Sequence, residues 1–346
     1  MIVILDSSNR QIGSGTTDFN GNFLVRWTSS NNVTSGKVRW FAEHSGNRFK
    51  VKTGTGGRHT FTSGTRTLNN GRTQTNPNSW GDIRWGSSTT PHPVSNVYDG
   101  AHRTWFYSAQ YSPRAIPNFV NVELRAFNTN CPTSCANALR VDLDTGADTP
   151  YVYSARTAHE LGHIVSDQVS QGREAASCND YSRNGAGWSI TSPEHMCAGY
   201  EEAYATLVGD IGRHWFNAPQ PFACGYETGV CSLNTETSSA AGGGSCDGSV
   251  EEERWVLTTL RFLWDVYDDV NDGGSESVRQ TYDRVIDNQG NFAIGTANHQ
   301  RDEPFAGGTL SDQDGKGQFD YLVNFETAHP VELDEADAIN CFPPGD

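Results

Sequence analysis

The sequence predicts an α+β protein in which a small all-β domain, residues 1–86, precedes a larger domain of strands and helices, residues 87–346. Two observations support this class. Short apolar runs separated by Gly, Asn and Ser turns dominate the first part, whereas longer helical patterns dominate the second. The length of 346 residues also suits two domains.

The first part contains short runs with the composition and spacing of strands, at residues 2–5, 23–27, 37–41 and 48–52. Residues 65–82 follow and are rich in Asn, Thr and Gly but poor in apolar side chains. Such composition is typical of loops, so this stretch is the predicted linker.

The second part begins with a predicted helix near 95–112 and two alternating strands. In 121–127, Val122 and Leu124 face one way; in 139–143, Leu139, Val141 and Leu143 share a face. Helices are expected near 152–170, 199–216, 250–268, 276–287 and 331–340. Strands followed by helices predict an α+β catalytic domain.

The charge of the chain restricts its partners. Its formal net charge is −16 and its pI is near 5.0. Nucleic acids and anionic membrane surfaces both require clustered Lys and Arg, so neither is expected as a partner. No apolar run approaches the roughly 18 residues that span a bilayer. A protein or peptide is the expected partner, and the sequence leaves the oligomeric state open.

Eight cysteines are scattered over the chain without any CxxC pair. This pattern favours disulfides, and hence a secreted protein, over a cysteine zinc site. The first residues lack the features of a secretory leader, so we expect the leader to be absent from this chain. Pairing of near neighbours is expected, as Cys131–Cys135, Cys178–Cys197 and Cys224–Cys231, which leaves Cys246 to pair with the distant Cys341.

A metal-binding motif lies in the helix predicted near 152–170. His159, Glu160 and His163 form the pattern HExxH, for which the expected number of chance matches is about 0.014. On a helix, positions i and i+4 share a face, so both imidazoles can reach one zinc ion at about 2.0–2.1 Å. Glu160 is then placed to act as general base on a water molecule at the metal.

A catalytic zinc needs a third protein ligand. The metzincin pattern requires Gly and His after the second histidine, but Ser166 and Val169 stand there. Asp167 lies one turn after His163, and we interpret it as a solvated or supporting carboxylate.

A second motif lies downstream, at residues 199–208, G-Y-E-E-A-Y-A-T-L-V. The HExxH helix followed by this block resembles the gluzincin metallopeptidases, the thermolysin-like superfamily. The resemblance implies a zincin-like fold in which Glu202 completes the zinc site and Glu201 replaces an Asn. The alternative, in which Glu201 binds and Glu202 faces solvent, stays open.

The same resemblance shows two departures. Thr206 stands where the family has an Asp that orients a ligand histidine, and Asp167, Asp180 or Asp210 could substitute. The family also uses a Tyr or His beyond the second helix to hold the oxyanion. Here the candidates are Tyr267, His214, Tyr282 and His299, with no choice made among them.

Residues 12–23 contain G-x-x-x-T-D-x-x-G-x-F, from Gly13 to Phe23. This segment resembles the carboxypeptidase-regulatory-like, transthyretin-type β-sandwich domains, which implies an accessory sandwich without catalysis. Two acidic turns, 268–273 and 312–317, are rich in oxygen ligands, but neither completes the EF-hand pattern, so Ca²⁺ is unsupported.

The sequence therefore predicts a secreted zinc endopeptidase whose metal is held by His159, His163 and Glu202, with Glu160 as general base. The strand at 139–143 is the expected edge that pairs with an extended substrate. The alternative is a catalytically inactive metallopeptidase scaffold that serves as an adhesion or carbohydrate-binding protein, motivated by the accessory domain and many Trp and Tyr residues.

Overall fold

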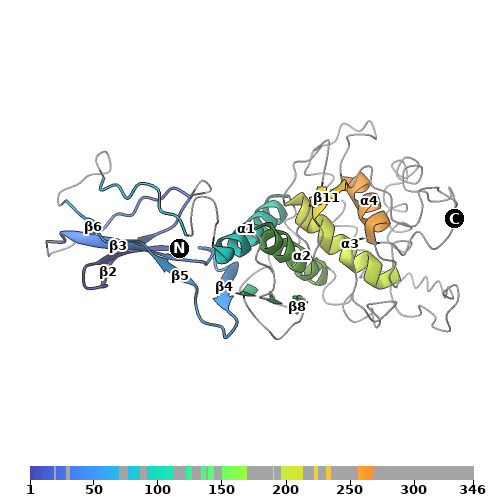
Figure 1. Cartoon of the computed structure of the whole chain (residues 1–346), viewed down its shortest axis with the longest axis horizontal. Helices are drawn as coiled ribbons and strands as arrows, with labels where there is room; N and C mark the ends of the chain where they lie inside the picture. Colours follow the sequence, from blue (N-terminus) through green and yellow to red (C-terminus); the bar gives the residue numbers. More distant parts are fainter. Residues whose placement is uncertain are drawn as a thin grey trace.

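The computed structural model describes residues 1–18, 21–28, 32–69, 77–85, 92–111, 122–126, 134–137, 139–143, 150–169, 190, 196–212, 222–224, 231–234 and 256–267. These residues form three sheets and four helices, which confirms the α+β class. In Figure 1 the first sheet lies at the left, β4 (Phe49–Thr53) and α1 (Pro93–Tyr111) lie near the middle, and the other helices lie at the right.

The first sheet is antiparallel and comprises β1 (Ile2–Asp6), β2 (Gln11–Gly15), β3 (Ser35–Phe41), β5 (Thr60–Thr62) and β6 (Arg66–Thr67). The strand order is β2-β1-β3-β5, and β6 also pairs with β3. The runs predicted at 2–5 and 37–41 therefore form strands. β1 is buried along its whole length, which makes it the centre of this part of the fold.

A predicted strand at residues 23–27 is not formed. Phe23 makes only an isolated bridge to Thr17, and the following residues pack as an extended segment over the sheet. A methyl group on Gly13 would lie 2.9 Å from Val25 Cγ1, so this glycine lets the segment approach β2 closely.

The predicted linker at 65–82 contributes to the first core. Leu68 and Trp80 are buried with Ile2, Ile4 and Val38 in one apolar cluster. The sequence contains few apolar residues in this stretch, but two of them, Leu68 and Trp80, carry large side chains that are buried. Burial of those side chains fixes both ends of the stretch on the sheet, so the described parts of it are not a linker.

The second sheet has the order β4-β7-β9-β8, with β4 (Phe49–Thr53), β7 (Val122–Ala126), β9 (Arg140–Asp142) and β8 (Cys135–Asn137). β4, β7 and β9 run parallel to one another, whereas β8 is antiparallel to β9. The run at 48–52 was expected in the accessory domain. It pairs instead with β7, more than 60 residues later in the chain.

The alternation predicted for two strands is largely confirmed. Val122, Leu124, Val141 and Leu143 are buried on the sheet. Leu139 is 40% exposed because it lies in the turn that precedes β9. The expectation that 139–143 forms a sheet edge is wrong, since β8 covers β9 on that side.

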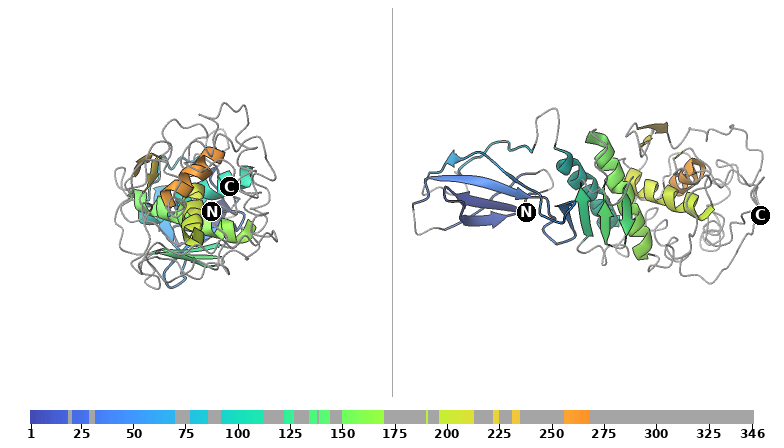
Figure 2. Two further views of the ribbon diagram at one scale, coloured as in Figure 1. Left: turned by 90° about the vertical axis from the view of Figure 1, so that its right-hand side faces the viewer. Right: turned by 60° about the horizontal axis from the view of Figure 1, so that its bottom comes forward.

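Four helices follow the predicted pattern: α1 (Pro93–Tyr111), α2 (Pro150–Val169), α3 (Met196–Ile211) and α4 (Val256–Tyr267). α1 and α2 contact the strands of the second sheet, α3 packs on α2, and α4 packs on α3 (Figure 2). The helices expected at 276–287 and 331–340 lie outside the described residues. None of the described helices is long and apolar enough to cross a membrane.

The main core lies between the second sheet and the helices. Buried residues of all four helices and of the strands form one cluster, including Phe49, Leu124, Val141, Leu161, Ile164, Tyr200, Tyr204, Leu207, Leu260 and Trp264. The helical positions that were predicted to be apolar, Leu161, Ile164 and Val165, are all part of it. This core fixes α2 and α3 against each other.

A two-stranded sheet, β10 (Phe222–Cys224) with β11 (Cys231–Asn234), places Cys224 and Cys231 opposite each other. This placement is compatible with the predicted disulfide between them, which stays a prediction. Each of the other predicted pairs includes a cysteine outside the described residues, namely Cys131, Cys178, Cys246 and Cys341.

Candidate metal centre

Helix α2 presents the HExxH residues. His159 and His163 are one turn apart, and their ring centroids lie 4.9 Å from each other at nearly a right angle. His159 and Glu160 are buried, whereas His163 is about one-fifth exposed. Because Leu161, Ile164 and Val165 anchor the helix in the core, both imidazoles are held on the side that faces α3.

Helix α3 brings Glu202 to the two histidines. Its Oε2 lies 3.0 Å from His159 Nε2 and 3.4 Å from His163 Nε2. One ligand atom from each of the three residues falls within 4.8 Å of the others, so the group could hold a metal ion. The geometry itself does not identify the metal.

Glu201 occupies a different position. Its Oε2 lies 4.0 Å from Nδ1 of His163, on the opposite edge of the ring from Glu202, and accepts a hydrogen bond of 3.4 Å from Ser166 Oγ. Glu202 is 4% exposed, which contradicts the alternative in which it faces solvent. Glu202 is therefore the carboxylate that lies next to the Nε2 atoms of both histidines, whereas Glu201 lies on the Nδ1 side of His163.

A glycine sets the separation of the two helices at this site. A methyl group on Gly162 would lie 2.5 Å from the backbone oxygen of Ala205, closer than any packing allows. Gly162 lies between the two histidines in α2, and Ala205 lies one turn after Glu202 in α3. The backbone contact of these small residues therefore brings the carboxylate within reach of the imidazoles.

Thr206 fixes the orientation of His159. Its hydroxyl donates to the backbone oxygen of Glu202 at 2.8 Å and lies 3.1 Å from His159 Nδ1. Since the hydroxyl proton is used on the carbonyl, the oxygen accepts from Nδ1, which must then carry a hydrogen. In the neutral imidazole, Nε2 is then left with a lone pair directed at Glu202.

This arrangement fits a bound cation. Glu202 Oε2 is buried and makes no hydrogen bond of good geometry within the described part of the chain, yet it faces the Nε2 atoms of both histidines. Acceptor atoms that face one another in a buried site repel unless a proton or a metal ion lies between them. Two imidazole nitrogens and one carboxylate oxygen are ligands that Zn²⁺ commonly takes.

The charges at the site also favour a cation. Burial by itself would lower the pKa of His163, but the negative charges of Glu202, Glu160 and Glu201 raise it to about 9. Burial would likewise raise the pKa of Glu202, but His163 and His159 lower it to about 2. The carboxylate is therefore ionised at neutral pH, and a metal ion that binds here displaces a proton from His163.

Other predicted site residues are not brought into this group. Asp210, one of three residues that could have replaced the missing Asp, is buried in α3 one turn after Thr206, but Thr206 itself takes that place on His159. Asp167 and Tyr267 belong to α2 and α4, where their side chains are not described. Asp180, His214, Tyr282, His299 and both acidic turns lie outside the described residues.

Sequence comparison gives no family for this chain. No protein-family model matches it, and a search of the curated proteins finds no similar sequence. The class of the site is therefore defined by its geometry alone, as a group of two histidines and a glutamate that could hold a metal ion.

We expect Thr206→Val to weaken the binding of added Zn²⁺ at this group by about 10- to 100-fold, because the isosteric valine removes the acceptor that orients His159. Thr206→Ser should restore most of the affinity, since it keeps the hydroxyl. Competition with a chromogenic chelator measures both affinities, and circular dichroism verifies the fold. Wild-type affinity in the valine variant would show that the hydroxyl does not orient the histidine.

Proposed function

We propose that the protein is a secreted, zinc-dependent endopeptidase with a zincin-like catalytic domain. The observation that carries the proposal is the meeting of His159, His163 and Glu202 around one point, with Glu160 on the same turn of α2. Structural zinc sites are usually closed by four protein ligands, whereas catalytic sites keep three and leave a position for water. Three candidate ligands within the described part of the chain are in keeping with a catalytic role.

In this proposal each residue has a defined task. His159, His163 and Glu202 hold the zinc ion, and Thr206 keeps His159 in the tautomer that binds metal. The zinc ion, when bound, supplies Lewis acidity and makes a water molecule easier to deprotonate. Glu160 accepts the proton of the attacking water and then delivers it to the nitrogen of the leaving amine.

The burial of Glu160 suits this task. It is 3% exposed, and its negative charge acts on His163 together with that of Glu202. Exclusion of bulk water from an active site limits the leakage of protons to solvent. In this proposal substrate adds to the adjoining sheet, because α2 contacts β8, which is the last strand of the second sheet within the described residues. An extended peptide can add to such an edge by main-chain hydrogen bonds.

The test begins with the metal. Protein purified without added metal should contain close to one zinc ion per chain by mass spectrometry of the elements, and it should cleave an unfolded protein such as casein. A chelator should remove both the zinc and the cleavage, and added Zn²⁺ should restore them. Zinc-loaded protein that cleaves no member of a broad peptide library would overturn the peptidase assignment and favour an inactive binding scaffold.

A further inference from the structure

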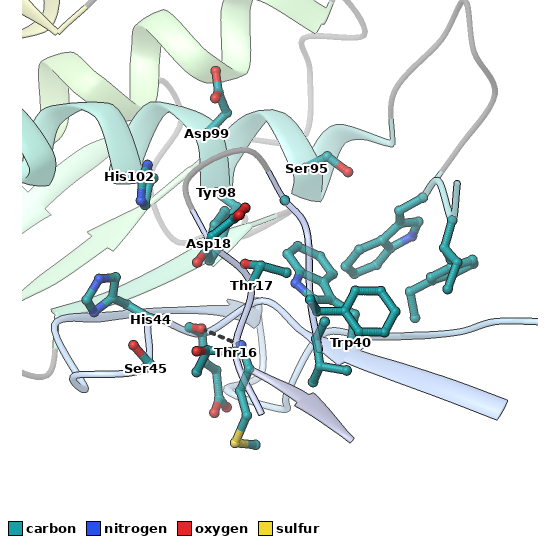
Figure 3. Close-up of a pocket in the computed structure, with 18 of the residues that line it drawn as sticks. Thr16, Thr17, Asp18, Trp40, His44, Ser45, Ser95, Tyr98, Asp99 and His102 are labelled. Carbon is teal, nitrogen blue, oxygen red and sulfur yellow. Dashed lines mark hydrogen bonds between the residues drawn. The ribbon is translucent and has the colours of Figure 1, made fainter. Parts of the chain in front are cut away.

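Histidines gather where the first sheet meets α1, and none of them belongs to the metal centre. His44 and His59 come from the segments that flank β4, and His92 and His102 come from the start and the middle of α1. In Figure 3, His44 lies below α1 and His102 projects from that helix above it. The centroids of these two rings are 6.3 Å apart. Since histidine changes its charge near neutral pH, this contact is a place where pH can act on the fold.

His92 is the N-cap residue of α1. Its Nδ1 accepts a hydrogen bond of 3.3 Å from the backbone N–H of Val94, and its carbonyl oxygen accepts one of 2.7 Å from the N–H of Ser95. Pro93, the first residue of the helix, has no N–H to satisfy. An N-cap acceptor is usually an oxygen of Ser, Thr, Asp or Asn. Here it is a ring nitrogen, which can accept only while it carries no proton.

His44 uses the same ring nitrogen in the same way. Its Nδ1 accepts a hydrogen bond of 3.1 Å from the backbone N–H of Gly46, in the turn between β3 and β4. The centroid of the ring lies 4.2 Å from that of Trp105 in α1 and 5.4 Å from that of Phe49. The bond to Gly46 therefore orders the turn while the ring itself packs against the helix.

Protonation would reverse the role of Nδ1 at both places. In the neutral imidazole one nitrogen donates and the other accepts, whereas both nitrogens of the imidazolium are donors. The new hydrogen on Nδ1 would point at a backbone N–H group. At His92 the new positive charge would also face the positive end of the α1 dipole. The closed contact therefore requires both rings in the neutral form, with the hydrogen on Nε2.

The charged groups around His44 oppose its protonation. Burial lowers the pKa of His44 to about 4, and His102, Arg48 and the amino group of Met1 act in the same direction. These groups come from α1, from the turn between β3 and β4 and from the residue before β1. The ring is thus held neutral from every element that these groups represent.

His92 is joined to the first sheet through Trp85. The centroid of Trp85 lies 4.9 Å from that of His92, in a stacked contact, and 4.9 Å from that of Trp40 in β3. Burial lowers the pKa of His92. Burial followed by the effect of His92 lowers the pKa of His59, whose ring also contacts Trp85. A charge on His92 would therefore arise among aromatic rings and beside a second histidine.

Three carboxylates line the pocket shown in Figure 3, namely Asp18, Glu43 and Asp99. Glu43 pairs with Arg58 at 2.9 Å, and Asp18 accepts hydrogen bonds from Asn22. Asp99 pairs with Arg103 at 2.9 Å, and its charge raises the pKa of His102 against the effect of burial. Because Asp99 favours the charged form of His102, we do not assign that ring to the acid-sensitive pair.

We propose that the contact between the first sheet and α1 is an acid-sensitive switch, in which protonation of His44 and His92 releases the turn between β3 and β4 and the first turn of α1. Above pH 7 both rings are neutral and the contact is closed. Below about pH 6.5, the ordinary pKa of histidine, the opened form takes up protons that the closed form excludes. Opening therefore becomes more favourable as the pH falls, and it requires no metal.

Hydrogen exchange of the full chain, followed by mass spectrometry at pH 7.5 and 5.5, tests this proposal. After correction for the intrinsic exchange rate, protection of residues 42–50 and 92–105 should fall by about 3- to 10-fold at the lower pH, where the smaller value allows for the partial exposure of His44. Protection of β1 and β2 should stay within about twofold, because the opening is local. Unchanged protection of both segments, or an equal fall in β1 and β2, would overturn the proposal.

Variants separate the two histidines from other groups that titrate. Asparagine keeps a side-chain acceptor that cannot be protonated and is a preferred N-cap residue, so His44→Asn combined with His92→Asn should retain its protection at pH 5.5. His92→Leu lacks the acceptor and should show low protection of residues 92–105 at both pH values. His102→Gln is the matched control and should keep the pH dependence of the wild type. A fall in the double asparagine variant as large as in the wild type, or loss of the pH dependence in His102→Gln, would contradict the assignment.

Discussion

Replacing Glu160 with glutamine is expected to lower kcat by about 10² to 10⁴-fold while leaving one zinc ion bound. The substitution keeps the shape of the side chain but removes its ability to accept a proton. The proposed metal ligands His159, His163 and Glu202 are untouched, so metal content and the melting temperature should change little. Steady-state cleavage of casein and elemental analysis measure the two quantities on the same preparation.

A matched substitution separates loss of the general base from loss of one negative charge. Glu123→Gln makes the same chemical change in β7, where Glu123 pairs with Lys52 on the surface of the second sheet. Its kcat should stay within about twofold of wild type, since a surface ion pair contributes little. If Glu160→Gln hydrolyses peptides as fast as Glu123→Gln, the proposed mechanism is wrong.

The parts of this site that sequence could predict are local. His159 and His163 are four residues apart, so a helix places them together whatever surrounds it. Glu202 is nearly 40 residues away, and only the resemblance to a family motif pointed to it. The choice between Glu201 and Glu202 depends on the rotation of α3 about its axis, which is set by the burial of Tyr200, Ala203 and Tyr204.

Thr206 shows why a departure from a motif is hard to interpret in advance. The sequence indicated only that an expected Asp was missing. The structure shows that a hydroxyl with its proton committed to the backbone oxygen of Glu202 offers an acceptor to His159 in the same way. The sequence does contain an indication of this hydrogen bond, because Thr206 is one helical turn after Glu202 and a threonine hydroxyl can reach the carbonyl of the preceding turn.

The assignment of β4 to the second sheet could not be predicted from the local sequence pattern. β4 has the composition of any short half-buried strand, and its sequence neighbours belong to the first sheet. Its partner is chosen by Phe49 and Val51, which are buried in the main core with Val122 and Leu124. Such a pairing depends on contacts between distant residues, whereas the turn residues that separate short strands report only where each strand ends.

Gly162→Ala is the substitution expected to damage the metal centre most without touching a ligand. The new methyl group would meet the backbone oxygen of Ala205 at 2.5 Å, and backbone cannot move aside as a side chain can. Overpacking of this kind costs about 1–3 kcal/mol. The helices should separate at the turn that carries Glu202, so we expect kcat/KM to fall by about 10²-fold.

Two further glycines distinguish this effect from a general loss of packing. Gly209→Ala should be neutral or stabilising, because its methyl group would meet Ala158 Cβ at an acceptable 3.4 Å in the same interface of α2 and α3. Gly100→Ala should lower the melting temperature as much as Gly162→Ala, since it clashes with the Ser154 oxygen at 2.5 Å, but it should leave zinc affinity unchanged. Equal zinc affinity in the Gly100 and Gly162 variants would mean that helix separation does not position Glu202. Reduced affinity in Gly162→Ala alone would tie metal binding to the close backbone contact between Gly162 and Ala205.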